Sequence, residues 1–372
     1  MLSFISDLPV ITDLSQVIDQ KMRLLDVRAP VEYQAGAVPG ADNMPLLDDA
    51  QRHQVGLRYQ QQGQESAIRL GLQLLDAAAK QQRTACWHAY ATRYPDGALY
   101  CFRGGLRSRI SQQWLYEATG IRYPRIEGGY KALRGYLLQQ LECYPRQMSP
   151  VVIAGQTGVG KTHLLHTLAP HLDLEGLAHH RGSAFGQYAV PQPTQADFEN
   201  RLACALIRLT QADQAYFVIE DESRQIGSRH IPAQLYAAFN QAPVVVLQTD
   251  IAQRVARICQ EYVYDGLAEH QQRLGAELGF QAWADSLNHS LERIQRRLGG
   301  VNYRKISQLL QTAITQHDHN PVQHHTWIRA LLTDYYDRMY DYQLARKQHR
   351  VVYCGDDVSV REYLSTYYSI CA

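Results

Sequence analysis

The stretch VVIAGQTGVGKT, residues 151–162, decides the fold of the second half of this 372-residue chain. Its first part is a short apolar run typical of a buried parallel strand, and its second part fits the pattern G-x-x-x-x-G-K-[ST]. The pattern predicts a strand, a phosphate-binding loop and then a helix over HLLHTLAP. Backbone N–H groups of such a loop cradle a diphosphate or triphosphate, Lys161 neutralises its oxygens and Thr162 helps to hold Mg²⁺. The residues predicted to bind the phosphates are Gly155, Thr157, Gly158, Val159, Gly160, Lys161 and Thr162.

Three acids follow the next apolar run, YFVI, at residues 220–222. An acid at the end of a neighbouring strand commonly completes the metal site of a phosphate loop. Asp221 is predicted to face the metal, with Glu220 and Glu222 as open alternatives. A further alternative is that the three acids only cap the segment that follows them.

The segment HRGSAFGQ, residues 180–187, has little apolar content and is predicted to be a loop that contacts a ligand or RNA. Its candidate contact residues are Arg181, Gly182 and Ser183. An ordinary surface turn is the alternative.

The first half of the chain alternates predicted strands with helical stretches. The predicted strands are RLLDVR (residues 23–28), TACWHAY (84–90) and ALYCF (98–102). This alternation predicts a parallel sheet covered by helices, with chemistry beyond the carboxyl ends of its strands. Cys101 lies at one of these ends.

The loop that begins at Cys101 has the features of a reactive cysteine site. Gly104 and Gly105 let several backbone N–H groups face one point, and the predicted helix RISQQWLYEAT directs its positive end towards that point. Arg103 and Arg107 add positive charge, so a thiolate, persulfide or selenide is stabilised there. Two alternatives stay open: Cys101 is a small buried hydrophobe, or Cys101 and Arg107, which are spaced as in cysteine phosphatases, hold a phosphate.

The composition of the chain and the position of its prolines predict two soluble domains. The 45% apolar and 20% charged fractions are those of a globular protein, and no apolar run is long enough to cross a bilayer. Asp7 and Asp13 do not fit a secretory signal, so a cytoplasmic location without membrane contact is expected. The seven cysteines form neither a disulfide framework nor a CxxC metal pair. Two prolines in YPRQMSP (144–150) place the predicted boundary between domains 1–143 and 144–372.

The second domain is predicted to continue with the strands AYFVIEDES (215–223) and PVVVLQT (243–249). A helical, basic and tyrosine-rich region follows from about residue 253 to 348, and VVYCG comes near the end of the chain. The expected fold is therefore α/β, with a helical extension on the second domain.

The segment DVRAPVEYQAGAVPGADNMP, residues 26–45, resembles the N-terminal signature of rhodanese-like domains. Ala37 stands where a histidine is common in that signature. One class of phosphatase shares the fold, so this resemblance leaves the phosphatase alternative open. The matching residues are Asp26, Arg28, Glu32, Tyr33, Gly36, Pro39, Gly40 and Ala41.

With the phosphate loop added, the chain resembles the bacterial tRNA 2-selenouridine synthases over nearly its whole length. CFRGGLRS (101–108) is similar to the family loop Cys-Trp-Arg-Gly-Gly-Met-Arg-Ser, from which it departs by Phe102 and Leu106. Other segments that resemble the family are EGGYKALR (127–134), LEGLAHHRGSAFG (174–186), QADFEN (195–200) and EDESRQIG (220–227). The resemblance implies a rhodanese-like domain joined to a P-loop NTPase-like domain.

The resemblance also implies the substrates. The wobble 2-thiouridine of certain tRNAs would be S-alkylated by geranyl diphosphate and would then exchange that sulfur for selenium from selenophosphate, which another enzyme must produce. Under this interpretation the phosphate loop holds geranyl diphosphate, so that hydrolysis of ATP is not required, and Cys101 acts in the selenium step. Arg103 and Arg107 would orient selenophosphate or the RNA backbone.

The helical region is the candidate tRNA surface, because basic side chains bind phosphates. Its candidate residues are Arg293, Arg296, Arg297, Arg304 and Lys305. Core packing is expected for most of the tyrosines at 335, 336, 340 and 342, with base stacking as the alternative.

Three other function classes are alternatives. They are a rhodanese-fold cysteine phosphatase or sulfurtransferase fused to an ATP-binding domain, an ATP-dependent kinase or adenylating enzyme with an inert docking domain, and an RNA-binding module without activity.

Overall fold

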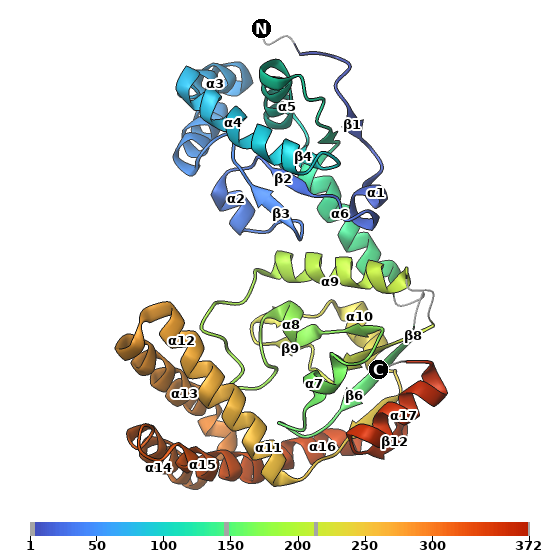
Figure 1. Cartoon of the computed structure of the whole chain (residues 1–372), viewed down its shortest axis with the longest axis vertical. Helices are drawn as coiled ribbons and strands as arrows, with labels where there is room; N and C mark the ends of the chain where they lie inside the picture. The colour runs from blue at the N-terminus through green and yellow to red at the C-terminus, as the bar shows by residue number, and fades with distance from the viewer. Residues whose placement is uncertain (1–3, 145–148, 212–214, 371–372) are drawn as a thin grey trace. The chain divides into compact units, whose positions relative to one another are not determined.

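A computed structural model describes residues 4–144, 149–211 and 215–370 (Figure 1). The chain forms two compact units: unit 1 comprises Met1–Leu141 and Thr194–Arg208, and unit 2 comprises Glu142–Pro193 and Leu209–Ala372. The predicted division between residues 143 and 144 differs from this in one main respect, because residues 194–208 belong to unit 1. Within the predicted linker, residues 145–148 lie outside the described residues.

Unit 1 contains a parallel five-stranded sheet of order β1-β5-β4-β2-β3. Leu24 and Leu25 of β2 and Leu99 of β4 are completely buried, as expected for strands covered on both faces. The α/β class predicted for this half is confirmed. The strands are β1 (Val10–Ile11), β2 (Leu24–Asp26), β3 (Ala41–Asn43), β4 (Ala98–Tyr100) and β5 (Arg125–Ile126).

Helices connect and cover this sheet. The prediction of a strand for TACWHAY (84–90) is wrong, because this segment lies inside helix α4. The buried residues of α4 are Thr84, Trp87, Tyr90 and Ala91, which from one turn to the next lie three or four positions apart, the period of a helix with one face on the core. The helices of unit 1 are α1 (Leu14–Asp19), α2 (Pro30–Gln34), α3 (Asp49–Leu74), α4 (Ala77–Arg93), α5 (Leu106–Thr119), α6 (Gly129–Cys143) and most of α9 (Gln195–Thr210).

Hydrogen bonds explain why α9 belongs to unit 1. The Asp197 carboxylate accepts from the backbone N–H of Ala37 at 2.8 Å, and the Asn200 amide donates to the Ala37 carbonyl at 2.7 Å. Arg134 of α6 donates to Asn200 Oδ1 at 2.9 Å. These long-range bonds hold a segment from the middle of the unit 2 sequence on the unit 1 fold.

Unit 2 contains a second parallel five-stranded sheet, of order β12-β11-β6-β8-β7. Each strand predicted from the sequence in this half is present, which confirms the α/β class. A short antiparallel pair, β9 (Gln225–Ile226) and β10 (Arg229–His230), lies outside the sheet. The strands of the sheet are β6 (Ser149–Ala154), β7 (His171–Leu172), β8 (Tyr216–Glu220), β11 (Val244–Leu247) and β12 (Val351–Gly355).

The helix after the phosphate loop is shorter than predicted. It is α7 (Lys161–Leu165), which buries Leu164 and Leu165 in the core of the sheet and ends before Thr167. Three other helices also accompany the sheet: α8 (Leu174–Ala178), α10 (Ala233–Phe239) and α17 (Asp357–Tyr368).

The predicted helical region of unit 2 has its own core, in which Trp283 and Trp327 are buried together with aliphatic side chains. Two stretches of π-helix, Cys259–Asp265 and Leu332–Tyr336, continue their neighbouring helices. No helix among the described residues combines the length and apolar character needed to span a bilayer. The helices of this region are α11 (Ile251–Ile258), α12 (Gly266–Leu274), α13 (Ala276–Leu298), α14 (Gly300–Thr315), α15 (His324–Leu331) and α16 (Asp337–Lys347).

Candidate active sites

Cys101 follows β4 directly and precedes the loop that leads into α5. It is buried, with 3% of its surface exposed, yet it lines a cavity of about 1160 Å³ whose lining residues all belong to unit 1. The sequence therefore predicted correctly that this residue ends a strand. Its thiol is inside the fold but can be reached from the cavity.

Glycines hold the cysteine loop in its conformation. Gly104 has φ of +63°, and a Cβ there would lie 2.6 Å from the backbone N of Gly128. A Cβ at Gly129 would lie 2.2 Å from the carbonyl oxygen of Cys101. The same oxygen accepts a hydrogen bond from the backbone N–H of Tyr130 at 2.9 Å. The segment EGGY (127–130) therefore packs directly against the backbone of the cysteine loop.

Arg107, in the first turn of α5, is fixed by a carboxylate that sequence reasoning did not assign to the site. Its two terminal nitrogens donate to the two oxygens of Glu32 at 2.5 and 3.0 Å. Burial opposes charge on both groups, but this pairing outweighs burial, lowering the pKa of Glu32 and raising that of Arg107. Arg103, in contrast, is exposed on the wall of the same cavity. The site thus has one fixed and one exposed guanidinium.

The Asp-x-Arg pair at the end of β2 is structural. Arg28 is 1% exposed and binds Asp26 with contacts down to 2.5 Å, while it donates to the carbonyl of Gly36 at 2.8 Å. The guanidinium also lies 4.0 Å from the centre of the Tyr130 ring. This buried pair ties the loop after β2 to α6, which lies beside the cysteine loop.

In unit 2, residues 155–162 form the predicted loop between β6 and α7. Close packing explains its glycines: a Cβ at Gly155 would be 2.8 Å from the carbonyl oxygen of Leu247, and Gly158 and Gly160 have φ of +78° and +95°. The Lys161 ammonium donates to the Gly155 carbonyl at 3.2 Å, so its side chain folds back over the loop. Val159 is buried in the core beneath.

Two arginines of α11 hold this loop, and no local sequence motif marks either of them. Arg254, only 3% exposed, donates to the carbonyl of Thr157 at 2.9 Å and to Gln156 at 2.7 Å. Asp337 of α16 holds the same guanidinium at 2.5 and 3.1 Å. Arg257 donates to the carbonyl of Val159. The loop is thus braced by the helical region through a buried ion pair.

Asp221, the acid predicted to face the metal, forms an ion pair with Lys347. Asp221 accepts from Lys347 at 2.5 Å, whereas Glu220, which is 1% exposed, accepts from the N–H groups of Leu174 and Glu175 through one oxygen. The other oxygen of Glu220 is buried without a hydrogen-bond partner. The structure therefore favours Glu220 over Asp221, because Glu220 keeps a buried oxygen without a hydrogen-bond partner whereas Asp221 is paired with Lys347.

A group of carboxyls surrounds the Thr162 end of the loop. Glu175 Oε2 lies 3.3 Å from the Thr162 hydroxyl. Burial raises the pKa of Glu220 well above its ordinary value, and the neighbouring Glu175 raises it further. Burial likewise raises the pKa of Glu222, although Lys161 opposes this. Among the described residues, no group of three or more His, Cys, Asp or Glu side chains has the arrangement of a metal site. Nevertheless, the unpartnered oxygen of Glu220 and the Thr162 hydroxyl fit the two protein ligands that a P-loop offers Mg²⁺.

The segment 180–187 lies beside these carboxyls. Gly182 has φ of +64°, and a Cβ there would meet the carboxylates of Glu175 and Glu222 at 2.0 and 2.8 Å. Arg181 is paired with Glu269 at 2.6 Å, and the Ser183 hydroxyl lies 2.6 Å from that of Tyr262. The predicted contact loop therefore borders the phosphate loop, but its polar side chains already have partners within unit 2.

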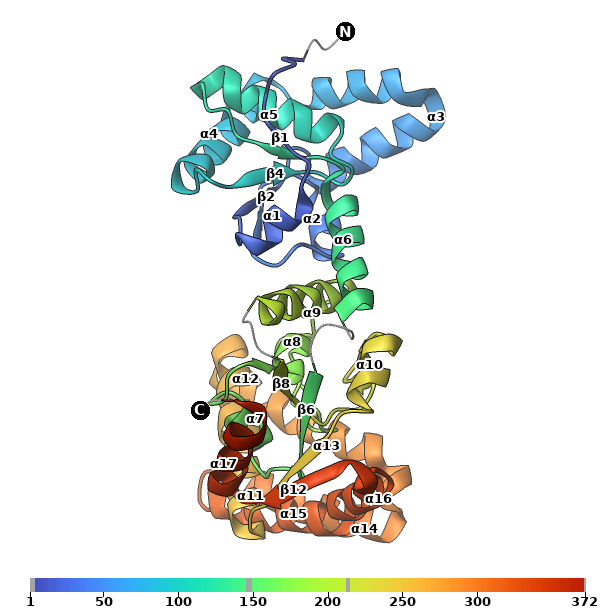
Figure 2. The ribbon, with the colours of Figure 1, turned by 90° about the vertical axis from the view of Figure 1, so that its right-hand side faces the viewer.

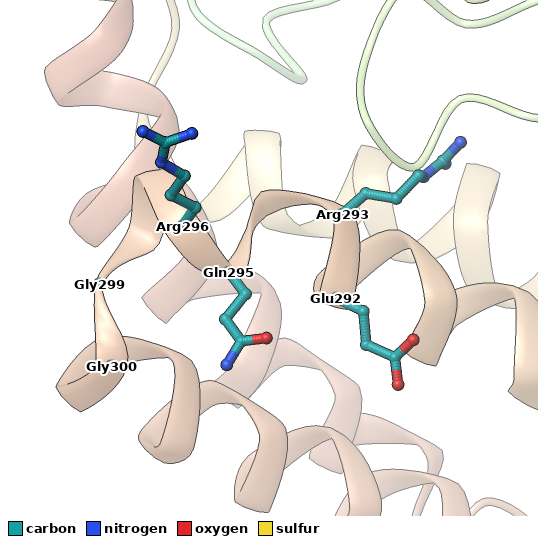
Figure 3. A pocket seen from close by; sticks show the side chains of 6 residues that line it. All are labelled: Glu292, Arg293, Gln295, Arg296, Gly299 and Gly300. Carbon is teal, nitrogen blue, oxygen red and sulfur yellow. The ribbon is translucent and has the colours of Figure 1, made fainter.

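The candidate RNA residues lie on α13 and α14 and are all exposed. Arg293 and Arg296 line a pocket of about 460 Å³, and Figure 3 shows that their side chains leave α13 towards the same side but point away from each other. Arg293 donates to the carbonyl of Ala184 at 2.6 Å, and Lys305 pairs with Asp334 at 2.9 Å. Arg297 and Arg304 do not line this pocket. Of these five exposed residues of α13 and α14, which we call the basic face, Arg293 and Arg296 are the two that line a common pocket.

The tyrosines of this region divide between core and surface. Tyr335 and Tyr336 are buried, as core packing requires, and Tyr340 is half-buried. Tyr342 is 67% exposed, the most of the four, and the Arg346 guanidinium lies 5.9 Å from the centre of its ring.

Comparison with known proteins adds independent information. A family model described as the tRNA 2-selenouridine synthase AAA domain matches residues 148–370. A Bordetella petrii protein named tRNA 2-selenouridine synthase is 50% identical over 343 residues, which cover 92% of this chain and 92% of that protein. Proteins of the same name from Hahella chejuensis and Pseudomonas putida are 47% and 45% identical, and they cover 92% and 96% of this chain and 90% and 97% of their own lengths.

Proposed function

This chain belongs to the tRNA 2-selenouridine synthase family, and we propose that it converts the wobble 2-thiouridine of tRNA into 2-selenouridine in two steps. One observation carries the proposal. A buried thiol beside a fixed arginine and an arginine-braced phosphate loop occur in separate compact units of one chain. Two such sites suit an activation step that releases diphosphate and a later exchange step.

The first step is assigned to unit 2. The thiouridine sulfur forms a bond to the first carbon of geranyl diphosphate, the carbon–oxygen bond breaks and diphosphate leaves. Backbone N–H groups of residues 155–162 and the Lys161 ammonium stabilise the charge that develops on the leaving group. Thr162 and Glu220 would hold Mg²⁺, which supplies further positive charge when bound. Because the leaving group is itself a diphosphate, the step does not require ATP hydrolysis.

The second step is assigned to unit 1. A thiocarbonyl sulfur leaves poorly, but an S-alkylated sulfur can leave as a thiol. The selenium of selenophosphate forms a bond to C2 of the base, the C2–S bond breaks and geranyl thiol leaves with a proton; water then cleaves the Se–P bond. Cys101 acts beside the selenium, and Arg107 and Arg103 supply positive charge for selenophosphate or the RNA backbone. A separate enzyme must supply selenophosphate.

The RNA is proposed to lie on the basic face of α13 and α14. The exposed guanidinium of Arg296 is the main candidate for a phosphate contact, and Arg293, which also donates to the Ala184 carbonyl, is the second. Lys305 is a weaker candidate, since its ammonium is already paired with Asp334.

A reconstitution tests the proposal. The protein is incubated with tRNA that carries 2-thiouridine, together with geranyl diphosphate and selenophosphate, and the nucleosides are identified by mass. We expect S-geranyl-2-thiouridine when selenophosphate is omitted and 2-selenouridine in the complete mixture. Absence of both nucleosides would refute the proposal.

A cysteine phosphatase is the second candidate, because Arg107 follows Cys101 at phosphatase spacing and both line one cavity. An aryl phosphate added to the same protein distinguishes the two. Release of phosphate that is lost in Cys101→Ser would favour hydrolysis over selenium transfer.

A further inference from the structure

The cavity beside Cys101 has walls of two kinds. The cysteine loop and Glu32 supply charged groups, whereas α3 and α5 supply apolar side chains. On the apolar wall, Ile68 and Leu72 of α3 and Leu106 of α5 are only partly buried. Exposed polar residues of α3, such as Arg52 and His53, also line the cavity. A reacting centre at Cys101 is therefore continuous with an apolar space.

Helix α3 leaves this apolar wall uncovered. Of its 26 residues, all of which are described, Ala67 alone is fully buried. A helix of this length in a globular protein normally buries a whole stripe on the core. Instead, α3 bends at Gly63, where φ is +78°, into the two arms visible in Figure 2, and side chains of both arms line the cavity. Val55 and Leu57 come from the first arm, Ile68 and Leu72 from the second.

Two glycines in the interior of α3 keep the cavity open. Gly56 and Gly71 both line it. A Cβ at Gly56 would meet no atom within 4 Å, and one at Gly71 would meet only Val55 Cγ2, at 3.7 Å. Since alanine is the better helix former and would fit at both positions, neither steric nor helical requirements explain these glycines. They leave volume beside the apolar side chains.

We propose that this cavity is the subsite for the ten-carbon geranyl chain of S-geranyl-2-thiouridine during the selenium step. The inference rests on the proposed function and deepens it. A cavity of about 1160 Å³ is ample for a prenyl chain and a base, since drug-sized ligands occupy ~300–1,000 Å³. The chain is entirely apolar, so its transfer from water to the wall of α3 and α5 is favourable.

A geranyl chain bound in the cavity would position the C2–S bond for the exchange reaction. With the chain against Ile68 and Leu72, the C2–S bond at its end lies towards Cys101 and the selenium nucleophile. As the C2–Se bond forms and the C2–S bond breaks, the sulfur takes the electron pair and a proton, and the geranyl thiol remains in the apolar space. Binding energy from the chain is thereby used to position the reacting carbon.

The test compares two RNA substrates with the full-length protein and selenophosphate. One anticodon stem-loop carries S-geranyl-2-thiouridine and the other S-methyl-2-thiouridine, and kcat/KM for 2-selenouridine formation is measured for each. We expect the wild type to prefer the geranyl substrate by ~10-fold or more, because each buried methylene adds to binding. Ile68→Trp and Gly56→Leu fill the cavity and should bring this ratio close to one.

Leu138→Trp is the matched control, because Leu138 is a half-exposed residue of α6 that does not line the cavity. It should keep the wild-type ratio. Equal use of both substrates by the wild type, or an unchanged ratio in both filled variants, would overturn the subsite. If the wild type makes no 2-selenouridine from either substrate, it is the proposed function that fails. Gly56→Leu adds its side chain in open space, so it guards against a folding defect of Ile68→Trp.

Discussion

Arg107 and Glu32 form a two-pronged ion pair beside Cys101, with nitrogen–oxygen distances of 2.5 and 3.0 Å. The pair joins the first turn of α5 to α2, which lies 75 residues earlier in the sequence. Such a fork fixes both the position and the plane of the guanidinium. The positive charge next to the thiol is therefore in place before any substrate arrives.

Replacement of Glu32 by glutamine should impair the selenium step alone. The amide keeps the size of the side chain but cannot accept both charged hydrogen bonds, so Arg107 loses its fixed orientation. We expect kcat/KM for 2-selenouridine formation from S-geranyl RNA to fall by ~10-fold and geranyl transfer to be unchanged. Glu117→Gln, which removes a more exposed pair with Lys80 in the same unit, is the control.

Replacement of Asp337 by asparagine should weaken unit 2 and its phosphate loop together. Arg254 is 3% exposed, so it would keep a buried charge without its full partner. The free energy of unfolding should fall by about 2–4 kcal/mol, as measured by denaturant titration. Geranyl transfer should fall more than selenium exchange on S-geranyl RNA. In Asp357→Asn, where the replaced carboxylate is itself 47% exposed and pairs with Arg361, both quantities should remain near wild type.

The buried carboxyl of Glu220 should make unit 2 less stable as pH rises. Burial raises its pKa above the ordinary 4.5, so the folded state keeps a proton that the unfolded state loses, and stability declines with pH from about 4.5 upwards. Glu220→Gln removes this decline. In the absence of Mg²⁺ at pH 7.5, the variant should melt roughly 2–4 °C above the wild type, with the difference disappearing near pH 4.

The same variant also tests the metal assignment. Mg²⁺ with inorganic diphosphate should stabilise the wild type against heat and should stabilise Glu220→Gln less. A matching replacement of Asp221, whose carboxylate pairs with Lys347, should leave the Mg²⁺ effect intact. Loss of the effect in Asp221→Asn but not in Glu220→Gln would restore Asp221 as the metal ligand.

Replacement of Arg296 by alanine should weaken tRNA binding in a salt-dependent way. If its guanidinium contacts one phosphate, the slope of log affinity against log salt should become shallower by roughly one. Arg338→Ala, at an exposed position on α16 outside the pocket, is the control. Equal slopes for Arg296→Ala and the wild type would remove this face from the RNA surface.

The sequence predicted the features that depend on local patterns. The strand ends at Cys101 and at Gly155, the glycine-rich loops and the helical region were readable because each follows a short motif or a clear hydrophobic run. TACWHAY failed because aromatic and branched residues favour strands locally, whereas tertiary packing of Trp87 decided for a helix. The choice among Glu220, Asp221 and Glu222 could not be made from the sequence, because the Lys347 ammonium that pairs with Asp221 comes from 126 residues further along the chain.

Contacts between residues far apart in the chain could not be predicted from a single sequence. Nothing local to Arg254 indicates that it holds the carbonyl of Thr157, and nothing local to Asp197 indicates that α9 joins unit 1. These contacts arise only when segments far apart in the chain pack together. The cavity wall formed by α3 was also missed, since an amphipathic pattern does not reveal whether its apolar side faces a core or an open space.

If the two steps occur at two sites, variants of the two sites must lose different steps. Lys161→Ala and Cys101→Ser are each given thiouridine tRNA with both small substrates, or S-geranyl tRNA with selenophosphate, and nucleosides are identified by mass. We predict that Cys101→Ser accumulates S-geranyl-2-thiouridine, whereas Lys161→Ala leaves thiouridine unchanged but converts S-geranyl tRNA to 2-selenouridine. Loss of both steps in both variants would contradict the assignment of the two steps to separate sites.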